Sequence, residues 1–323
     1  MAFKDLEKER VSLNNFFSVL GFAAFFVLTW LGELFLTGGE MAKSLLWAGL
    51  MTIVFVVLLV VLVRIKGVTS HFRAWKVVEL AVLGLYVVTA VLLSRPARHF
   101  FEVNAGKAAV RAQTRADVDS VRAIFTKYEN FENDAITNTR LGILNSINGT
   151  STSDLKDFYS SMKINPRDVD NVDRYCDLQK EKLLGNKYDQ YKKEHLSRLN
   201  NWEQTVKDWS LLRIPGIASE GKVAGEIVTA LSDYSKKADL PVITSEGKTH
   251  NLVSRKQVFS MEVPKLGLAD TLKSLPPSAK ALAVIVLVAI HLLILISYFF
   301  GFRSPKQRFE INVPDDAPGV IIL

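Results

Sequence analysis

The stretch "AVIVLVAIHLLILISYFFGF", residues Ala283–Phe302, is apolar almost throughout and carries a single histidine, His291. About 20 apolar residues in a row are enough for a helix to cross the hydrocarbon core of a bilayer. The stretch therefore predicts a transmembrane helix over 280–301. It also raises the question of what an imidazole does at mid-depth of a span.

Three further apolar runs precede this one and predict transmembrane helices over about 16–36, 45–65 and 76–94. The first run begins too far into the chain, and is too long, for a secretory signal peptide, so we expect it to be retained. The sequence thus predicts a mainly α integral membrane protein with four transmembrane helices. One large domain, 95–279, lies between the third and the fourth.

Basic residues flank these runs on alternate loops, and such residues favour the cytoplasmic side of a membrane. They are Lys4, Lys8 and Arg10 in 1–15, Arg64, Lys66, Arg73 and Lys76 between the second and third runs, and Arg303, Lys306 and Arg308 in 302–323. Arg95 and Arg98, after the third run, point the other way but are outnumbered. We expect both termini in the cytoplasm and the large domain in the periplasm, with the protein in a bacterial inner membrane.

Apolar residues at helical spacing predict that the periplasmic domain is mainly α, with a small β segment. We expect helices over 97–147, 151–162, 165–185, 186–213, 218–237 and 268–275, and a β hairpin that turns at 245–248. The first of these helices is expected to continue from the third span with a kink at Pro96. The third is expected to begin at Asn165 as its cap, with Pro166 in its first turn, and "IPG" at Ile214 is expected to stop the fourth.

Charge and cysteine content narrow the class of protein. The net charge is +7, but much of the excess flanks the spans, and the periplasmic domain is nearly balanced. A basic patch for nucleic acid is not visible. The single cysteine, Cys176, cannot form a disulfide within the chain, so we expect it to be buried as a small hydrophobe or to pair between chains.

Motifs for catalysis and metal binding are missing from the sequence. It holds no Gly-rich phosphate loop, HExxH, G-x-S-x-G or CxxC, and none of its five histidines has a partner at ligand spacing. We therefore predict a protein that is not an enzyme and that has no catalytic, cofactor-binding or metal-binding residues. The aromatic stripe Tyr188, Tyr191, Trp202 and Trp209 is expected to form core rather than a ligand cage, with His195 on the same face.

Ionisable residues inside the spans are the better candidates for functional residues. Glu33 and Glu79 lie near span ends, so we expect their carboxylates to snorkel to the interface, the alternative being that they face the bundle interior. His291 is expected to be a neutral ring that bonds to another helix. Its partner could be Thr29, Thr52, Tyr86 or Thr89. The alternative for His291 is a proton- or ion-linked role.

The tail 302–323 ends in Val320, Ile321, Ile322 and Leu323 after a strand-like "RFEINV". Disordered tails are usually poor in such residues, so the tail is a candidate docking segment for a partner or a neighbouring copy. A mobile tail is the alternative.

The features together favour a non-enzymatic, multi-pass scaffold or assembly subunit of a cell-envelope complex of the secretion-system kind. Its partners would be the lipid bilayer, other envelope proteins and further copies in a homo- or hetero-oligomer, with no nucleic acid and no cofactor. The alternatives are a sensor or regulator that works through its periplasmic domain, an oligomeric channel, or a proton-linked membrane protein. The short cytoplasmic segments weigh against the sensor, and the apolar spans weigh against a channel.

Overall fold

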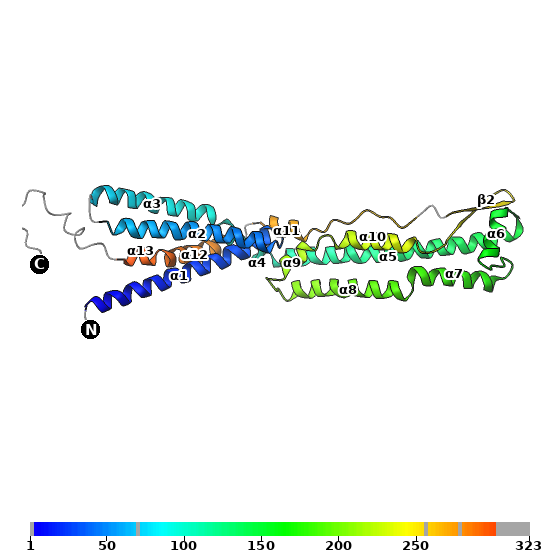
Figure 1. The fold of residues 1–323 in the computed structure, drawn as a ribbon, viewed down its shortest axis with the longest axis horizontal. Coiled ribbons are helices and arrows are strands. Elements are labelled where there is room, and N and C mark those ends of the chain that lie inside the picture. The colour runs from blue at the N-terminus through cyan, green and yellow to red at the C-terminus, as the bar shows by residue number, and fades with distance from the viewer. Residues whose placement is uncertain (1–2, 69–71, 255–257, 277–279, 302–323) are drawn as a thin grey trace, which may run out of the picture. The chain divides into compact units, whose positions relative to one another are not determined.

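The computed structural model describes residues 3–68, 72–254, 258–276 and 280–301. The chain divides into two compact units (Figure 1). Arg111–Leu268 forms one, called here the head unit, and the described residues before and after it form the other, called the span unit. Nearly all of the described elements are helices, with three short strands, so the mainly α fold predicted from the sequence is confirmed.

The span unit contains three helices that are long and apolar enough to cross a membrane. Helix α1 is Phe3–Leu36, α2 is Met41–Lys66 and α3 is Phe72–Leu93. The candidate spans are Leu13–Leu36, all of α2, and Ala74–Ala105, which runs past the end of α3. The three spans predicted before residue 95 fall inside these segments.

The fourth apolar run forms two helices instead of one. Helix α12 covers Lys280–Ile294, and α13 covers Ile296–Phe300, with a turn at Leu295 between them. Its longest apolar helical stretch, Ala281–Ile294, is shorter than the candidate spans. The uninterrupted helix predicted over 280–301 is therefore wrong in this detail.

Helix α1 holds the span unit together through a stripe of buried, mostly small residues. These are Ser18, Gly21, Phe25, Thr29 and Gly32. A Cβ on Gly21 would lie 2.8 Å from the backbone nitrogen of Ile294, and one on Gly32 would overlap the backbone of Pro96. Small residues let membrane helices approach closely, so α1 packs backbone to backbone at these two glycines.

The chain after α3 departs from the long helix predicted over 97–147. Helix α4 covers Arg95–Ala105, and α5 covers Lys107–Asn145. The first break falls at Ser94, because Pro96 favours the first turn of a new helix. The second falls at Gly106, whose N–H still bonds to the Glu102 carbonyl.

The head unit is built on α5, along which α7 (Val169–Leu184) and α8 (Asn186–Lys207) run in the opposite direction (Figure 1). Four cross-links mark this pairing along its length. They join Arg111 to the Val206 and Lys207 carbonyls, Arg122 to Glu203, Glu129 to Lys192, and Arg140 to Asp173. Residue numbers rise along one side and fall along the other, as an antiparallel pair requires.

Three helix boundaries in the head unit differ from the prediction, one of them being the start of the helix predicted over 218–237, which begins at Val223. Helix α7 starts at Val169, because Asp168 caps it by accepting a bond from the Asn171 N–H, whereas Asn165 and Pro166 lie in a turn before it. Helix α8 ends at Lys207, well before Ile214. The "IPG" sequence does not stop a helix there but begins the next one, α9 (Ile214–Ser219), because Pro215 fits a first turn.

A small β sheet closes one end of the head unit, after α10 (Val223–Ser235). Strands β2 (Val242–Glu246) and β3 (Thr249–Val253) form the predicted hairpin, with Gly247 at a φ of +62° in its turn. A third strand, β1 (Thr150–Ser151), pairs parallel to β3. The sequence did not indicate β1, because two residues carry no periodicity.

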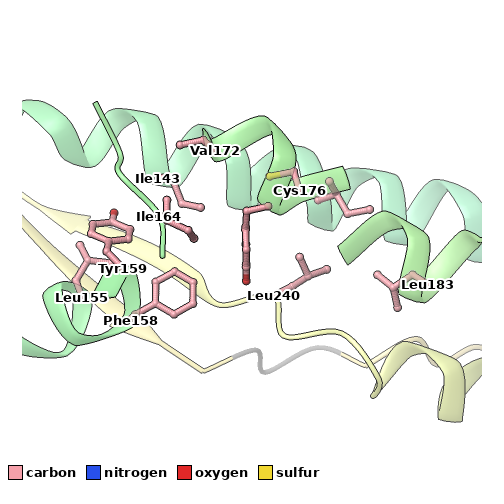
Figure 2. Packing of buried hydrophobic residues seen from close by; sticks show 11 residues of the cluster. Ile143, Leu155, Phe158, Tyr159, Ile164, Val172, Cys176, Leu183 and Leu240 are labelled. Atoms are coloured by element: carbon pink, nitrogen blue, oxygen red, sulfur yellow. The ribbon is translucent and has the colours of Figure 1, made fainter. Parts of the chain in front are cut away.

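Beside this sheet lies a hydrophobic cluster, shown in Figure 2. It draws on the end of α5, on the short α6 (Ser153–Ser161), on α7 and on the loop before β2. Figure 2 shows Phe158 and Tyr159 of α6 turned toward Ile143 and Ile164, with Leu240 beside them. The cluster fastens α6 and the hairpin to α5.

Cys176 belongs to this cluster and is 4% exposed. Burial raises the pKa of its thiol above the ordinary value, so the thiol is protonated and unreactive near neutral pH. We expect a maleimide to leave Cys176 unmodified in the folded protein and to modify it after denaturation, as measured by mass spectrometry. Rapid modification of the folded protein would contradict the burial of this side chain.

The extended segment that leaves the hairpin returns along α5 and is fixed at two points. Phe259 packs edge-on against Tyr128 and Phe131, and its N–H bonds to Ser235. Farther along, the Asp117 carboxylate accepts bonds from the N–H groups of Gly267 and Leu268, at 2.8 and 2.9 Å. Leu268 begins helix α11 (Leu268–Ser274), so Asp117 caps a helix that begins 151 residues later in the sequence.

Candidate functional site

His291 of α12 lies where the helices of the span unit meet. Its ring centroid is 5.4 Å from that of Phe25 on α1, 5.0 Å from Phe55 on α2 and 5.7 Å from Tyr86 on α3. Phe25 and Phe55 sit near the middle of their candidate spans. The imidazole therefore lies level with the middle of these two helices, and it is enclosed by aromatic rings from three helices.

Both ring nitrogens of His291 have hydroxyl partners. Nδ1 lies 3.0 Å from Tyr86 Oη, and Nε2 lies 3.3 Å from Ser94 Oγ. A neutral imidazole donates from one nitrogen and accepts at the other, and a hydroxyl can take either part. The ring thus ties α12 to α3 and to the break that follows α3. Tyr86 is one of the four partners that the sequence left open, whereas Ser94 is new.

Replacing His291 by leucine is expected to destabilise the span unit by about 1–3 kcal/mol, since it removes two interhelical hydrogen bonds and strands the buried Tyr86 hydroxyl. Asparagine and glutamine should cost less, because each keeps a polar group for one partner. Aspartate should cost most, because a charge in a span is expensive to insert. Thermal unfolding in detergent measures the series.

Two outcomes would contradict this account of His291. A His291→Leu variant as stable as the natural protein would make the two hydrogen bonds incidental. Asparagine and glutamine variants that assemble fully, yet impair the protein's function in cells as severely as the leucine variant, would favour a proton-linked role for the ring.

A second polar group lies toward one end of the same helices. The Tyr298 hydroxyl of α13 donates to Glu79 of α3 at 2.5 Å, and Glu79 is only 5% exposed. Lys66, the last residue of α2, donates to the carbonyls of Tyr298 and Phe299. The prediction that Glu79 snorkels to the interface is therefore wrong. Its carboxylate is turned into the unit, where a tyrosine hydroxyl replaces water.

The turn between α12 and α13 is bonded to α1 through Ser18. The Ser18 hydroxyl donates to the Ile294 carbonyl at 2.9 Å and lies 3.4 Å from the Ser297 N–H. Its oxygen is also 2.6 Å from Ser297 Oγ. A helix break leaves backbone groups without their usual partners, and here one side chain from α1 supplies them.

The remaining candidates from the sequence are dispersed. Glu33 is half-buried near the end of α1 and is not brought to His291 or Glu79. Residues 320–323 of the tail lie outside the described residues. Another polar pair that the sequence did not indicate lies in α4: His99 is 3.1 Å from Glu102, and its Nε2 donates to the Leu272 carbonyl at 2.7 Å.

In the head unit, two residues of the aromatic stripe are core: Tyr188 and Trp202 are 2% and 5% exposed, and the Tyr188 hydroxyl donates to Glu129. Tyr191 is only partly buried, and Trp209 is partly buried in the turn after α8. His195 is half-buried against Tyr191, with ring centroids 4.4 Å apart, and burial lowers the pKa of its imidazole. Within the part of the chain that the structure describes, no group of three or more His, Cys, Asp or Glu side chains could hold a metal ion.

The site is thus a set of side chains that join helices, centred on His291. These side chains can form hydrogen bonds between helices and fix the orientation of one helix against another. No family model, curated protein or solved structure matches this chain, so its function is argued from this geometry.

Proposed function

We propose that the protein is a four-span membrane protein, with both termini in the cytoplasm and the head unit in the periplasm of a bacterial inner membrane. Polar contacts at one end of the span unit support four passes. They connect α13 to Ser18 near the start of the first candidate span, to Lys66 at the end of the second and to Glu79 near the start of the third. Starts and ends meet at one level when four helices alternate in direction.

Charge supports the orientation. The end of the span unit marked by Lys66 also carries Arg64, in the last turn of α2. Basic residues at a span end favour the cytoplasmic side. In the sequence, the head unit comes after the third candidate span and before the start of α12. In this orientation the chain therefore enters and leaves the head unit on the periplasmic side.

We propose further that the protein is a non-enzymatic scaffold or assembly subunit of a larger cell-envelope complex. One observation carries this proposal: the polar side chains within the spans are used to bond one helix to another. His291 bonds to Tyr86 and Ser94, Glu79 to Tyr298, and Ser18 to the α12–α13 turn. Helices locked in this way suit a fixed anchor better than a transport path, which needs groups free to bind and release.

The head unit is suited to docking. Its long helices are joined by ion pairs at intervals along α5, and its closed end is fastened by the hydrophobic cluster. It also exposes apolar side chains beyond the core, including Leu141 and Leu178, which are 47% and 59% exposed. A rigid body with exposed apolar residues presents a preformed surface to another protein.

The experiment is site-specific photo-cross-linking in living cells. A photoreactive residue replaces Leu178 or Leu141, and the adducts are identified by mass spectrometry, with a matched probe at buried Leu183 as the control. A scaffold should give the same one or few envelope proteins from the exposed positions, and these should co-purify in fixed ratio in mild detergent. Adducts that vary from one preparation to the next, with no partner in fixed ratio, would contradict the proposal.

A further inference from the structure

A groove of about 430 Å³ opens beside His291, between α3 and α12. Its rims are apolar and point outward. Val87 and Val91 of α3 are 54% and 74% exposed, and Val288 and Leu292 of α12 are 52% and 54% exposed. If these helices span a bilayer, the groove opens toward the acyl chains of the lipids.

The groove is not uniformly apolar. His291, Tyr86 and Ser94 line it, and Arg98 of α4 lies at one end. The Arg98 side chain is 48% exposed, and its Nε is 3.4 Å from Glu102 Oε1. That contact uses one edge of the guanidinium, which has five N–H donors in all. The terminal amino groups are suited to a bidentate bond with an anion such as a phosphate.

We propose that this groove binds an anionic phospholipid, whose acyl chain fills the space between α3 and α12 and whose phosphate bonds to Arg98. The apolar walls match an acyl chain, and the positive charge at the end matches the headgroup. A basic side chain close to the membrane surface attracts anionic lipid headgroups. The proposal requires only that α3 and α12 lie in a bilayer, so it can fail while the scaffold function stands.

The size of the groove suits a lipid chain. Its volume of about 430 Å³ falls in the usual range for small-molecule sites, about 300–1,000 Å³. A partner's transmembrane helix on the same face is the alternative that the test must separate from lipid.

The test is native mass spectrometry of the full chain released from nanodiscs that contain phosphatidylglycerol and phosphatidylcholine in equal amounts. The natural protein should retain phosphatidylglycerol preferentially. The Arg98→Gln variant should lose that preference several-fold. Arg95→Gln is the matched control, because Arg95 is an exposed residue of the same helix and does not line the groove.

A second pair of variants tests the groove itself. Ala90 lines it, whereas Ala81 is an exposed alanine of the same helix outside it. Ala90→Phe should reduce the retention of both lipids, and Ala81→Phe should not. Val91→Trp places a large side chain on the exposed rim and serves if Ala90→Phe fails to fold.

Three outcomes would overturn the proposal. The first is equal retention of phosphatidylglycerol by the natural protein and by Arg98→Gln. The second is unchanged retention when the groove is filled. The third is a photoreactive residue at Val91 that attaches to another protein rather than to lipid, which would make the groove a helix-docking site.

Discussion

The Gly32→Ala variant is expected to lose most of its folded, monodisperse protein on extraction in mild detergent. A Cβ at this position would overlap the backbone of Pro96. Flexible side chains can move aside, but here the obstacle is the main chain of α4, so α1 or α4 must shift as a whole. Overpacked sites typically cost about 1–3 kcal/mol, and occasionally more, and we expect the upper end. Size-exclusion chromatography after stepwise heating measures the loss.

The chain offers matched controls for this prediction. Gly49 in α2 and Gly84 in α3 are also helical glycines in candidate spans, and an added Cβ would meet nothing within 4 Å at either. Gly49→Ala and Gly84→Ala should be neutral or slightly stabilising, because alanine favours the helix. Gly21→Ala should fall between, since its Cβ would meet Ile294 at 2.8 Å. Equal stability of Gly32→Ala and Gly49→Ala would contradict the close packing of α1 on α4.

The Asp117→Ala variant is expected to release the extended segment from α5. Asp117 is 5% exposed and accepts hydrogen bonds from Gly267, Leu268 and the Gln113 amide. Its removal strands two backbone N–H groups, at about 1–3 kcal/mol each. For a unit of this size each kcal/mol lowers the unfolding temperature by about 2–4 °C, so we expect a drop of roughly 4–24 °C.

Hydrogen exchange on the full-length protein locates this effect. Peptides that cover residues 258–268 should exchange much faster in Asp117→Ala, whereas peptides from α7 should change little. Asp119→Ala is the control, since Asp119 is on the same helix but pairs with Arg122 at the surface, where an ion pair is worth at most about 1 kcal/mol. Unchanged exchange at Gly267 and Leu268 would contradict the role of Asp117.

Periodicity and length predicted where most helices lie. The apolar runs before residue 95 correspond to the three candidate spans, and the apolar residues Val118, Val121 and Phe125 of α5 are buried. Helix ends were harder to predict, because they depend on side-chain bonds that a pattern does not contain. Asp168 rather than Asn165 caps α7.

The fine structure of the fourth apolar run could not be read from its composition. Ser18 supplies the bonds that the turn at Leu295 needs, and it comes from a helix at the other end of the chain. Gly106 is a comparable case, because a single glycine in a polar helix does not by itself predict a break.

The candidate site was predicted in part. A histidine in an apolar run predicts a polar partner, and Tyr86 was among the alternatives. Ser94 was missed because it stands at the predicted end of its span. It follows Tyr86 by about two helical turns, and both side chains face the His291 ring. Glu79 was misassigned because nearness to a span end suggests snorkelling. Its partner Tyr298 lies 219 residues away, and no local pattern reveals such a pair.

Cysteine labelling on intact cells tests whether the chain crosses the membrane four times and carries the head unit outside the cytoplasm. In a Cys176→Ser background, single cysteines are placed by Ser153→Cys in the head unit, Gly67→Cys after α2 and Ser304→Cys in the tail. Ser153 and Gly67 are exposed. We expect a membrane-impermeant maleimide to label Ser153→Cys on intact cells and to label the other two only after permeabilisation. Labelling of Ser304→Cys together with Ser153→Cys would mean that α12 and α13 do not cross the membrane, and a protected Ser153→Cys would place the head unit in the cytoplasm.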